Sequence, residues 1–314
     1  MLTGVSVTER QPLDPRDPRP TSSWFRQPVR QRLGSVALRL AGRLLGQHPI
    51  VLEYPPPDPN LERWGWGSRS NAALTELLGR SVDLYQTSIE VIERCGPDLV
   101  LIPDSDEGHG EPFWDQHWFT GLDAAALYAF IRARAPARYH EIGSGHSTLF
   151  AGRAIHDAGL STHVLSVDPR PRANVDLICN EVIRAQLQDA DTERVAALGA
   201  GDILLIDSSH YVLKGSDVVA FFFDVLPVLQ QGVLVGVHDV FLPDDYPWWL
   251  SDRWYSEQYL MAAWLLGAAE KMRVVLPIHY CATRPQIRSK LETLWARLAL
   301  PGVAYGSTLW FETS

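Results

Sequence analysis

The chain has 314 residues, a net charge of −9 at pH 7 and a hydrophobic content of 46% that includes 11 tryptophans. This composition supplies enough apolar surface for the core of one α/β domain. No apolar run reaches the roughly 18 residues that a membrane span needs, which argues against a membrane-spanning protein. We therefore expect a soluble globular protein.

The charge is uneven along the chain. Residues 1–46 hold eight arginines and three acidic residues, a charge of +5, which leaves −14 for the remainder. Since phosphate contacts dominate affinity for nucleic acid, the acidic main body is predicted not to bind nucleic acid. The cysteines Cys95, Cys179 and Cys281 are far apart and form no C-x-x-C pair, so neither a disulfide framework nor a zinc knuckle is indicated. We expect a reducing, cytoplasmic location.

The N-terminal part differs in composition from the rest. Residues 1–22 are rich in Pro, Arg and Asp, which is typical of a disordered tail. Over residues 24–45, apolar positions recur with helical period between arginines, which predicts a basic amphipathic helix. This helix would either attach to an anionic membrane or an acidic partner, or lie against the main domain, and the second interpretation is favoured. Further helices are predicted within 71–95 and over 121–136, on either side of a polar loop that is expected to face substrate.

From residue 137 onward, apolar strands alternate with helices. Strands are predicted at 137–143, 163–168, 202–207 and 232–239, with helices at 147–158, 171–188 and 215–229. Such βαβ units predict an α/β fold, a Rossmann-like, doubly wound and mostly parallel sheet covered by helices on both faces, with an N-terminal helical extension. Ligands of such sheets lie at the carboxyl ends of the strands. A helix at 255–270, a strand at 273–278 and an apolar segment at 305–312 complete the chain.

The turn after the first strand of this alternation contains Gly143 and Gly145, which let backbone N–H groups approach a ligand closely. Thr148 stands where the third glycine of G-x-G-x-x-G would be, and the sequence has neither the G-K-[ST] of a P-loop nor the G-x-S-x-G of a nucleophile elbow. Asp168 closes the next strand, where a carboxylate can accept hydrogen bonds from ribose hydroxyls. NAD and S-adenosylmethionine (SAM) both satisfy this geometry.

Glu141 favours SAM. A carboxylate beside the glycine turn would repel a pyrophosphate, whereas it suits a cofactor that ends in an amino acid with ammonium and sulfonium charges. Asp189, in "QDAD" ahead of the strand at 202–207, is a candidate partner for the adenine amino group. Each of these acids could instead be a helix cap or a solvated side chain, but their recurrence at or near successive strand ends argues for a ligand.

Four segments together resemble the class I SAM-dependent methyltransferases, in particular bacterial small-molecule or sugar-type enzymes. They are "EIGSGHST" (141–148), "GDILLIDSSH" (201–210), "GVLVGVHDVFLPDDYP" (232–247) and "EQYL" (257–260). The resemblance covers about residues 110–265. Composition, periodicity and this resemblance together predict three parts: a disordered tail (1–22), a helical extension (23–110) and a SAM-binding methyltransferase domain (111–314). The residues expected to contact SAM are Glu141, Gly143, Ser144, Gly145, His146, Ser147, Asp168, Asp189, Asp207 and Ser208.

The ends of the strands at 202–207 and 232–239 carry the expected chemistry. Methyl transfer from SAM is an in-line displacement, so the enzyme must orient the acceptor and remove a proton from it. Histidine titrates near neutral pH, and we predict His210, Asp207 and His238 as catalytic residues, with His210 favoured over His238 as general base.

A metal is a second use for these residues. Catechol-type methyltransferases place a divalent cation between acids at the matching strand ends, which here hold Asp207, His238 and Asp239. Histidine among the ligands suits manganese or iron better than magnesium. The alternative is that His238 and Asp239 only hydrogen-bond the following loop.

The segment after these residues is rich in aromatics. Trp248, Trp249, Trp254 and Tyr255 lie among charged residues, which suits a sugar-like or aromatic acceptor, although packing of a C-terminal cap would explain them equally well. Glu257 begins a predicted helix, where an acid complements the helix dipole, and is interpreted as structural.

The sequence thus predicts a SAM-dependent methyltransferase, with O-methylation of a small-molecule or glycan-like hydroxyl. A homodimer is compatible with this reading. Two alternatives stay open. One is an NAD-linked oxidoreductase, and the other is a SAM-fold binding or scaffold protein without catalysis.

Overall fold

The structure is a computed structural model. It describes residues 60–314, apart from residues 109, 120, 301 and 303 and the side chain of Ala269, together with short pieces between residues 36 and 58. The chain divides into two compact units, Met1–Pro57 and Asp58–Ser314. In the first unit, residues 36–38, 40–42 and 44 are helical, whereas the predicted tail and the arginines of the predicted basic helix lie outside the described residues.

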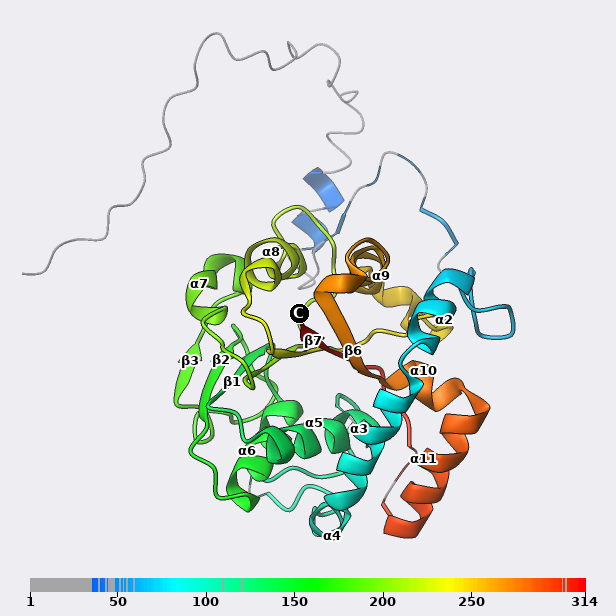
Figure 1. Ribbon diagram of the computed structural model, residues 1–314. Coiled ribbons are helices and arrows are strands. Elements are labelled where there is room, and N and C mark those ends of the chain that lie inside the picture. The colour runs from blue at the N-terminus through cyan, green and yellow to red at the C-terminus, as the bar shows by residue number, and fades with distance from the viewer. Residues whose placement is uncertain are drawn as a thin grey trace, which may run out of the picture. The chain divides into compact units, whose positions relative to one another are not determined.

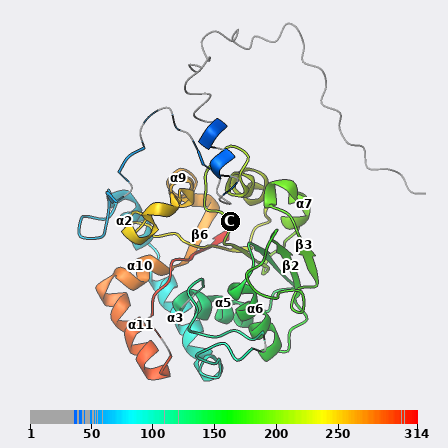
Figure 2. The ribbon, with the colours of Figure 1, turned by 180° about the vertical axis from the view of Figure 1, so that it is seen from behind.

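The second unit, as far as it is described, contains one seven-stranded sheet in the order β3-β2-β1-β4-β5-β7-β6 (Figures 1 and 2). The strands are β1 (Arg138–Ile142), β2 (His163–Val167), β3 (Glu181–Ile183), β4 (Ile203–Ile206), β5 (Leu234–Val237), β6 (Met272–Pro277) and β7 (Leu309–Thr313). The first five run parallel, and β7 pairs antiparallel with both β5 and β6. The predicted Rossmann-like, mostly parallel sheet is confirmed.

Helices cover both faces of the sheet. Figures 1 and 2 show α3, α5 and α6 on one face and α8 and α9 on the other. The helices of the unit are α2 (Ala72–Gly79), α3 (Val82–Arg94), α4 (Gly96–Leu99), α5 (Gly121–Arg134), α6 (His146–Asp157), α7 (Thr192–Val195), α8 (Asp217–Ala220), α9 (Glu257–Gly267), α10 (Ile278–Thr283) and α11 (Pro285–Leu298). Because both faces are covered, the central strands are continuous apolar runs, and every residue of β4 and β5 is buried.

Helix α5 is buried on almost all sides, from Gly121 to Ile131. Its alanines allow close approach to α3 and α6, which pack against it. Helix α3 also contacts β6, where Ser88 Oγ donates a hydrogen bond to the carbonyl of Val275 at 3.0 Å. Helices α2, α3 and α4, from the predicted N-terminal extension, therefore lie in the same compact unit as the sheet.

The prediction of a helix over 171–188 is wrong. The structure has the short strand β3 and a 3₁₀ helix at Leu187–Asp189 in this range. Asn180 pairs with Val164 at the start of β2, through its side-chain oxygen and its backbone N–H, at 2.8 and 2.9 Å. This pairing draws the segment onto the sheet edge, where tertiary contacts outweigh local helix propensity. The helix predicted over 215–229 is confirmed only as α8 followed by π and 3₁₀ turns, the last of which contains Pro227.

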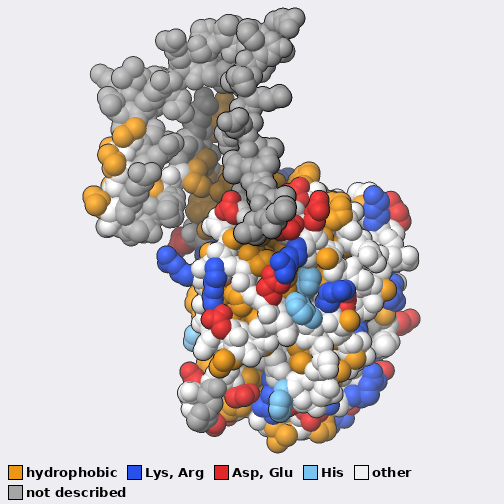
Figure 3. Space-filling model, turned by 90° about the vertical axis from the view of Figure 1, so that its left-hand side faces the viewer, with side chains coloured by type: hydrophobic (Ala, Val, Ile, Leu, Met, Phe, Trp, Pro, Cys, Tyr) orange, Lys and Arg blue, Asp and Glu red, His pale blue; other side chains and the backbone are white. Residues whose placement is uncertain are grey.

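On the face drawn in Figure 3, basic, acidic and uncharged side chains are interspersed over the described atoms. Among the helices that the structure describes, none has the length and apolarity needed to cross a membrane.

Candidate active site

The glycine turn joins β1 to α6 and lies against the end of β4. Gly143 has φ +80°, and a Cβ placed on it would lie 1.8 Å from the backbone oxygen of Asp207. Any other residue would be strained in this conformation and would also displace the end of β4. Glycine at 143 therefore lets the ends of β1 and β4 approach each other.

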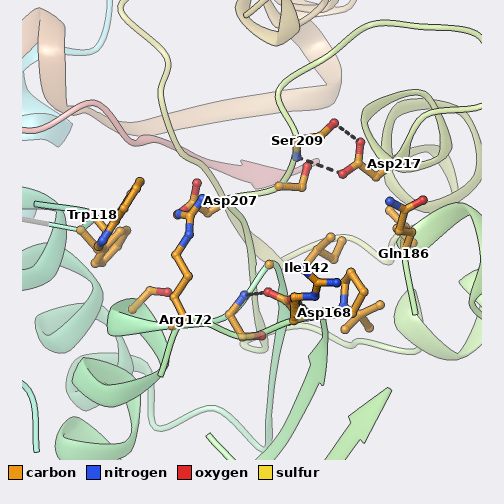
Figure 4. A pocket seen from close by; sticks show the side chains of 18 of the residues that line it. Trp118, Ile142, Asp168, Arg172, Gln186, Asp207, Ser209 and Asp217 are labelled. Carbon is orange, nitrogen blue, oxygen red and sulfur yellow. Dashed lines mark hydrogen bonds between the residues drawn. The ribbon is translucent and has the colours of Figure 1, made fainter. Parts of the chain in front are cut away.

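A cavity of about 230 Å³ opens beside this turn (Figure 4). Its walls are the turn itself, Asp168 after β2, residues 185–187 and residues 207–209 after β4. Of the residues predicted to contact SAM, those that line the cavity are Gly143, Ser144, Gly145, His146, Ser147, Asp168, Asp207 and Ser208. The turn thus gathers most of the predicted cofactor contacts around one space.

Polar groups in the cavity walls fit a polar ligand. Asp168 accepts hydrogen bonds from the backbone N–H of Ser144 at 2.7 Å and of Arg170 at 2.6 Å, which hold the carboxylate at the cavity wall. By contrast, Ser208 Oγ and His146 Nδ1 are buried and have no hydrogen-bond partner in the described chain. A buried polar atom without a partner costs about 1–3 kcal/mol, so a ligand with matching donors and acceptors would stabilise this arrangement.

Glu141 does not face the cavity. It is fully buried, its Oε1 accepts a hydrogen bond from Ser147 Oγ, and its Oε2 accepts one from Thr148 Oγ1 at 2.6 Å. Burial raises the pKa of Glu141 to about 8, although the two hydroxyls oppose the shift. Its carboxylate therefore fixes the start of α6 in this structure.

Asp189 is exposed at the end of its 3₁₀ helix and is not among the residues that line the cavity. At the matching wall lie Gln186 and Leu187 instead. Asp189, the predicted partner of the adenine amino group, thus lies outside the cavity wall.

A cluster of histidines and carboxylates adjoins the cavity at Asp207. The Oδ1 atom of Asp207 lies 3.2 Å from His210 Nε2 and 3.2 Å from His238 Nδ1. Asp239 lies 3.7 Å from each of the two rings. The residues that sequence reasoning placed at the ends of two strands are thus brought together, and Asp207 belongs to both the cluster and the cavity wall.

Two further acids complete the cluster. Glu257, at the start of α9, is fully buried, and its Oε2 lies 2.8 Å from His210 Nδ1. Asp123, on α5, lies 3.5 Å from His238 Nε2 and accepts backbone hydrogen bonds from Ser307 and Thr308. Glu257 was interpreted from the sequence only as an acid that complements the helix dipole, but its side chain also contacts His210 and fixes that ring. The sequence signal for Asp123 is the single acid in an alanine-rich helix, in the first turn and away from the arginines of the last turn.

The carboxylates determine the charge of the two histidines. Burial alone would lower the pKa of His210 and His238, but the neighbouring carboxylates raise both pKa values well above the usual range. Burial would likewise raise the pKa of Asp207, but His238 and His210 hold it well below its usual value. The neighbouring carboxylates therefore favour the protonated form of both rings.

Two residues of this cluster have a strained backbone conformation. His210 and Asp239 are non-glycine residues with φ of +62° and +55°. Such conformations cost of order 1–3 kcal/mol and persist where the surroundings fix them. The backbone carbonyl of His210 accepts hydrogen bonds from the N–H groups of Ser256 and Glu257 at 2.9 and 3.2 Å, so the beginning of α9 fixes this loop.

Three residues of the cluster form a candidate ligand set for a metal ion. One ligand atom from each of Asp207, His238 and Asp239 lies within 4.8 Å of the others. Two carboxylates and an imidazole suit a borderline divalent cation. The excess of carboxylates over histidines around them also favours a bound cation.

Residues 140–240 match the model of a family described as a methyltransferase domain. This part of the chain is therefore similar to a methyltransferase domain. The matched residues include the glycine turn, Asp168 and the ends of β4 and β5, so the resemblance seen in the sequence is confirmed. A comparison with curated proteins gave no match.

Two solved structures are similar to this chain at low sequence identity. One is an O-methyltransferase from Bacillus cereus in complex with SAH, with 13% identity and a TM-score of 0.33 over 73% of this chain and 91% of that one. The other is a cofactor-bound protein from MTB, with 15% identity and a TM-score of 0.32 over 66% of this chain and 90% of that one.

Proposed function

We propose that this methyltransferase transfers the methyl group of SAM to a hydroxyl oxygen of a small-molecule or glycan-like acceptor. The observation that carries the proposal is the place of Asp207, which lines the cofactor cavity and contacts both histidines of the cluster. A methyl donor in the cavity would therefore lie next to groups that can orient a hydroxyl and accept its proton.

In the proposed reaction, the S–CH₃ bond of the donor breaks as the C–O bond to the acceptor forms, and the hydroxyl proton leaves. The products are a methyl ether, S-adenosylhomocysteine (SAH) and a proton. We assign the proton to His210, whose ring is held at one nitrogen by Glu257 and faces Asp207 with the other. His210 would accept the proton in its neutral form, and the surrounding carboxylates, which raise its pKa, would stabilise the protonated ring that results.

A divalent cation is part of the proposal, with Asp207, His238 and Asp239 as its ligands. Such an ion would lower the pKa of the acceptor hydroxyl and compete with the protons on the histidines. Asp123 would act from outside the ligand set, because its contact with His238 Nε2 orients that ring. Manganese and iron suit a ligand set with a histidine better than magnesium does.

Aromatic side chains support an acceptor with apolar faces. Trp248, Trp249 and Trp254 are 65%, 49% and 47% exposed, so packing alone does not account for them. Tyr255 lies against His210 with a ring-centroid separation of 4.3 Å. Sugars and aromatic rings both stack on such surfaces.

Binding and turnover measurements with His210→Ala test the proposal. SAH affinity should stay within about twofold of wild type, because His210 does not line the cavity, while methyl transfer should fall by about 100-fold or more. NADH serves as the comparison ligand. Binding of NADH in place of SAH would favour an oxidoreductase. A scaffold protein would instead bind SAH without turnover, and its partner interactions would be unchanged in the double variant Asp207→Ala/His210→Ala.

A further inference from the structure

Two arginines lie against one tryptophan at the mouth of the cofactor cavity. The guanidinium carbon of Arg172 is 4.0 Å from the ring centroid of Trp118, and that of Arg253 is 5.8 Å from it. Trp118 and Arg172 both line the cavity, and Figure 4 shows them next to each other at its edge. The three side chains come from the loop before α5, the segment after β2 and the 3₁₀ helix Trp248–Arg253.

Neither arginine forms an ion pair with a described carboxylate within 4.0 Å. Ten of the described arginines form ion pairs with carboxylates within 4.0 Å, whereas seven, among them Arg172 and Arg253, form none. The hydrogen bond found for the Arg253 guanidinium goes to the hydroxyl of Tyr255 at 3.0 Å. In a chain of net charge −9, two unpaired guanidiniums beside one ring are available to bind an anion.

This pair of arginines connects the cofactor cavity with the reacting cluster. The backbone N–H of Arg172 donates to the carbonyl of Ser144 in the glycine turn at 3.1 Å, which fixes its position beside the cavity. Arg253 contacts the ring of Tyr255, which in turn lies against His210. A group held by the two arginines would therefore lie near both the methyl donor and the proposed base.

We propose that Arg172 and Arg253 bind an oxyanion group, a carboxylate or a phosphate, on the acceptor. The proposal rests on the proposed function, and it adds the chemical class of the substrate: a hydroxyl compound that also carries an acidic group. The carboxylate-rich cluster would repel such an acceptor, and the two arginines offset that repulsion while they fix the position of the acidic group. Neutral hydroxyl compounds would lack this contact and bind more weakly.

The test uses the full chain in EDTA at low ionic strength, saturated with SAH, and titrates inorganic phosphate and acetate by calorimetry. Wild type should bind at least one of the two anions. Arg253→Gln and Arg172→Gln should each weaken that binding about tenfold, as expected for a lost charge-assisted hydrogen bond. Arg273→Gln is the matched control, because Arg273 is also half exposed but is paired with Glu312, and it should match wild type. Stronger binding of phosphate would indicate a phosphorylated acceptor, and stronger binding of acetate would indicate a carboxylate.

Three results would overturn the proposal. Wild type could bind neither anion, or Arg253→Gln could bind them as wild type does. Alternatively, Arg253→Gln could lose as much affinity for SAH as for the anion. The arginines would then bind the carboxylate of the cofactor itself. Loss of SAH binding by wild type would instead contradict the proposed function, and the anion titrations without SAH would still decide this inference.

Discussion

His210 Nδ1 lies 2.8 Å from Glu257 Oε2, and both side chains are buried. This contact joins the loop after β4 to the beginning of α9, and it leaves His210 Nε2 directed at Asp207. The first residue of the "EQYL" segment therefore orients a histidine of the site. Gln258 makes a parallel contact, because its Oε1 accepts the backbone N–H of Phe241 after β5 at 2.9 Å. Two consecutive residues of α9 thus hold the loops that carry both histidines.

Replacing Glu257 with glutamine should lower kcat without a matching loss of cofactor affinity. Glutamine keeps the size of the side chain but not the charge that orients His210, so we expect kcat to fall at least about tenfold and the Kd for SAH to stay within about twofold. Glu270→Gln, at an exposed position after the same helix, is the control. Equal kcat in Glu257→Gln and wild type would show that the contact does not serve the reaction.

Asp168→Asn should weaken SAH binding by about tenfold or more, since the carboxylate lies in the cavity wall and charge-assisted hydrogen bonds contribute about 1.5–3 kcal/mol. Calorimetric titration of the variant measures this directly. Asp189→Asn is the matched substitution outside the cavity and should leave the Kd within about twofold. A larger effect at Asp189 than at Asp168 would place the nucleoside elsewhere.

Gly143→Ala should destabilise the fold as well as the site. The added Cβ would collide with the backbone of Asp207 at a residue whose φ is +80°, so we expect a loss of more than about 2 kcal/mol in the free energy of unfolding. Gly267→Ala, which has no atom within 4 Å of the added Cβ, should have little effect. Urea denaturation compares the two. Similar stabilities would contradict the close approach of β1 and β4.

The pH dependence of stability should contain a contribution from Glu141. Its pKa is raised from 4.5 to about 8 in the folded protein, so the folded state holds a proton that the unfolded state releases between these values. This contribution is complete below about pH 4.5 and is lost as the pH rises towards 8, with a size of at most about 5 kcal/mol. Glu141→Gln removes it, so its unfolding free energy should fall less from pH 5 to pH 8 than that of wild type. Glu76→Gln, at an exposed site, should behave as wild type.

Much of this architecture could be predicted from local patterns. The buried strands β4 and β5 are unbroken apolar runs, and the glycine turn marks the end of β1. The position of β7 between β5 and β6 could not be read from the sequence, because this pairing joins segments about 40 to 80 residues apart.

The site was predictable where its residues follow strands. Asp207, His210, His238 and Asp239 were placed at two strand ends, and parallel strands bring those ends together. Glu257 and Asp123 reach the same cluster from helices, where an acid at a helix start or in a buried helix has an ordinary structural explanation. For Glu141 the prediction from strand position was misleading. The sequence assigned its carboxyl group to the cofactor, but in the structure this group accepts hydrogen bonds from the Ser147 and Thr148 hydroxyls of α6.

Metal binding should depend on the ligand set alone. Thermal denaturation of the EDTA-treated protein should shift upward on addition of MnCl₂, since an ion that binds only the folded state stabilises it. The shift should be lost in Asp239→Asn and His238→Gln and kept in Asp189→Asn. An equal shift in all four proteins would mean that manganese binds elsewhere.

The central claim is that the cavity beside Gly143 and Asp168 holds SAM. Calorimetric titration of the purified chain with SAH, with NADH as the comparison, tests it most directly. We predict micromolar binding of SAH, weakened in Asp168→Asn, and no binding of NADH. Absence of SAH binding, or binding of NADH in its place, would contradict the account.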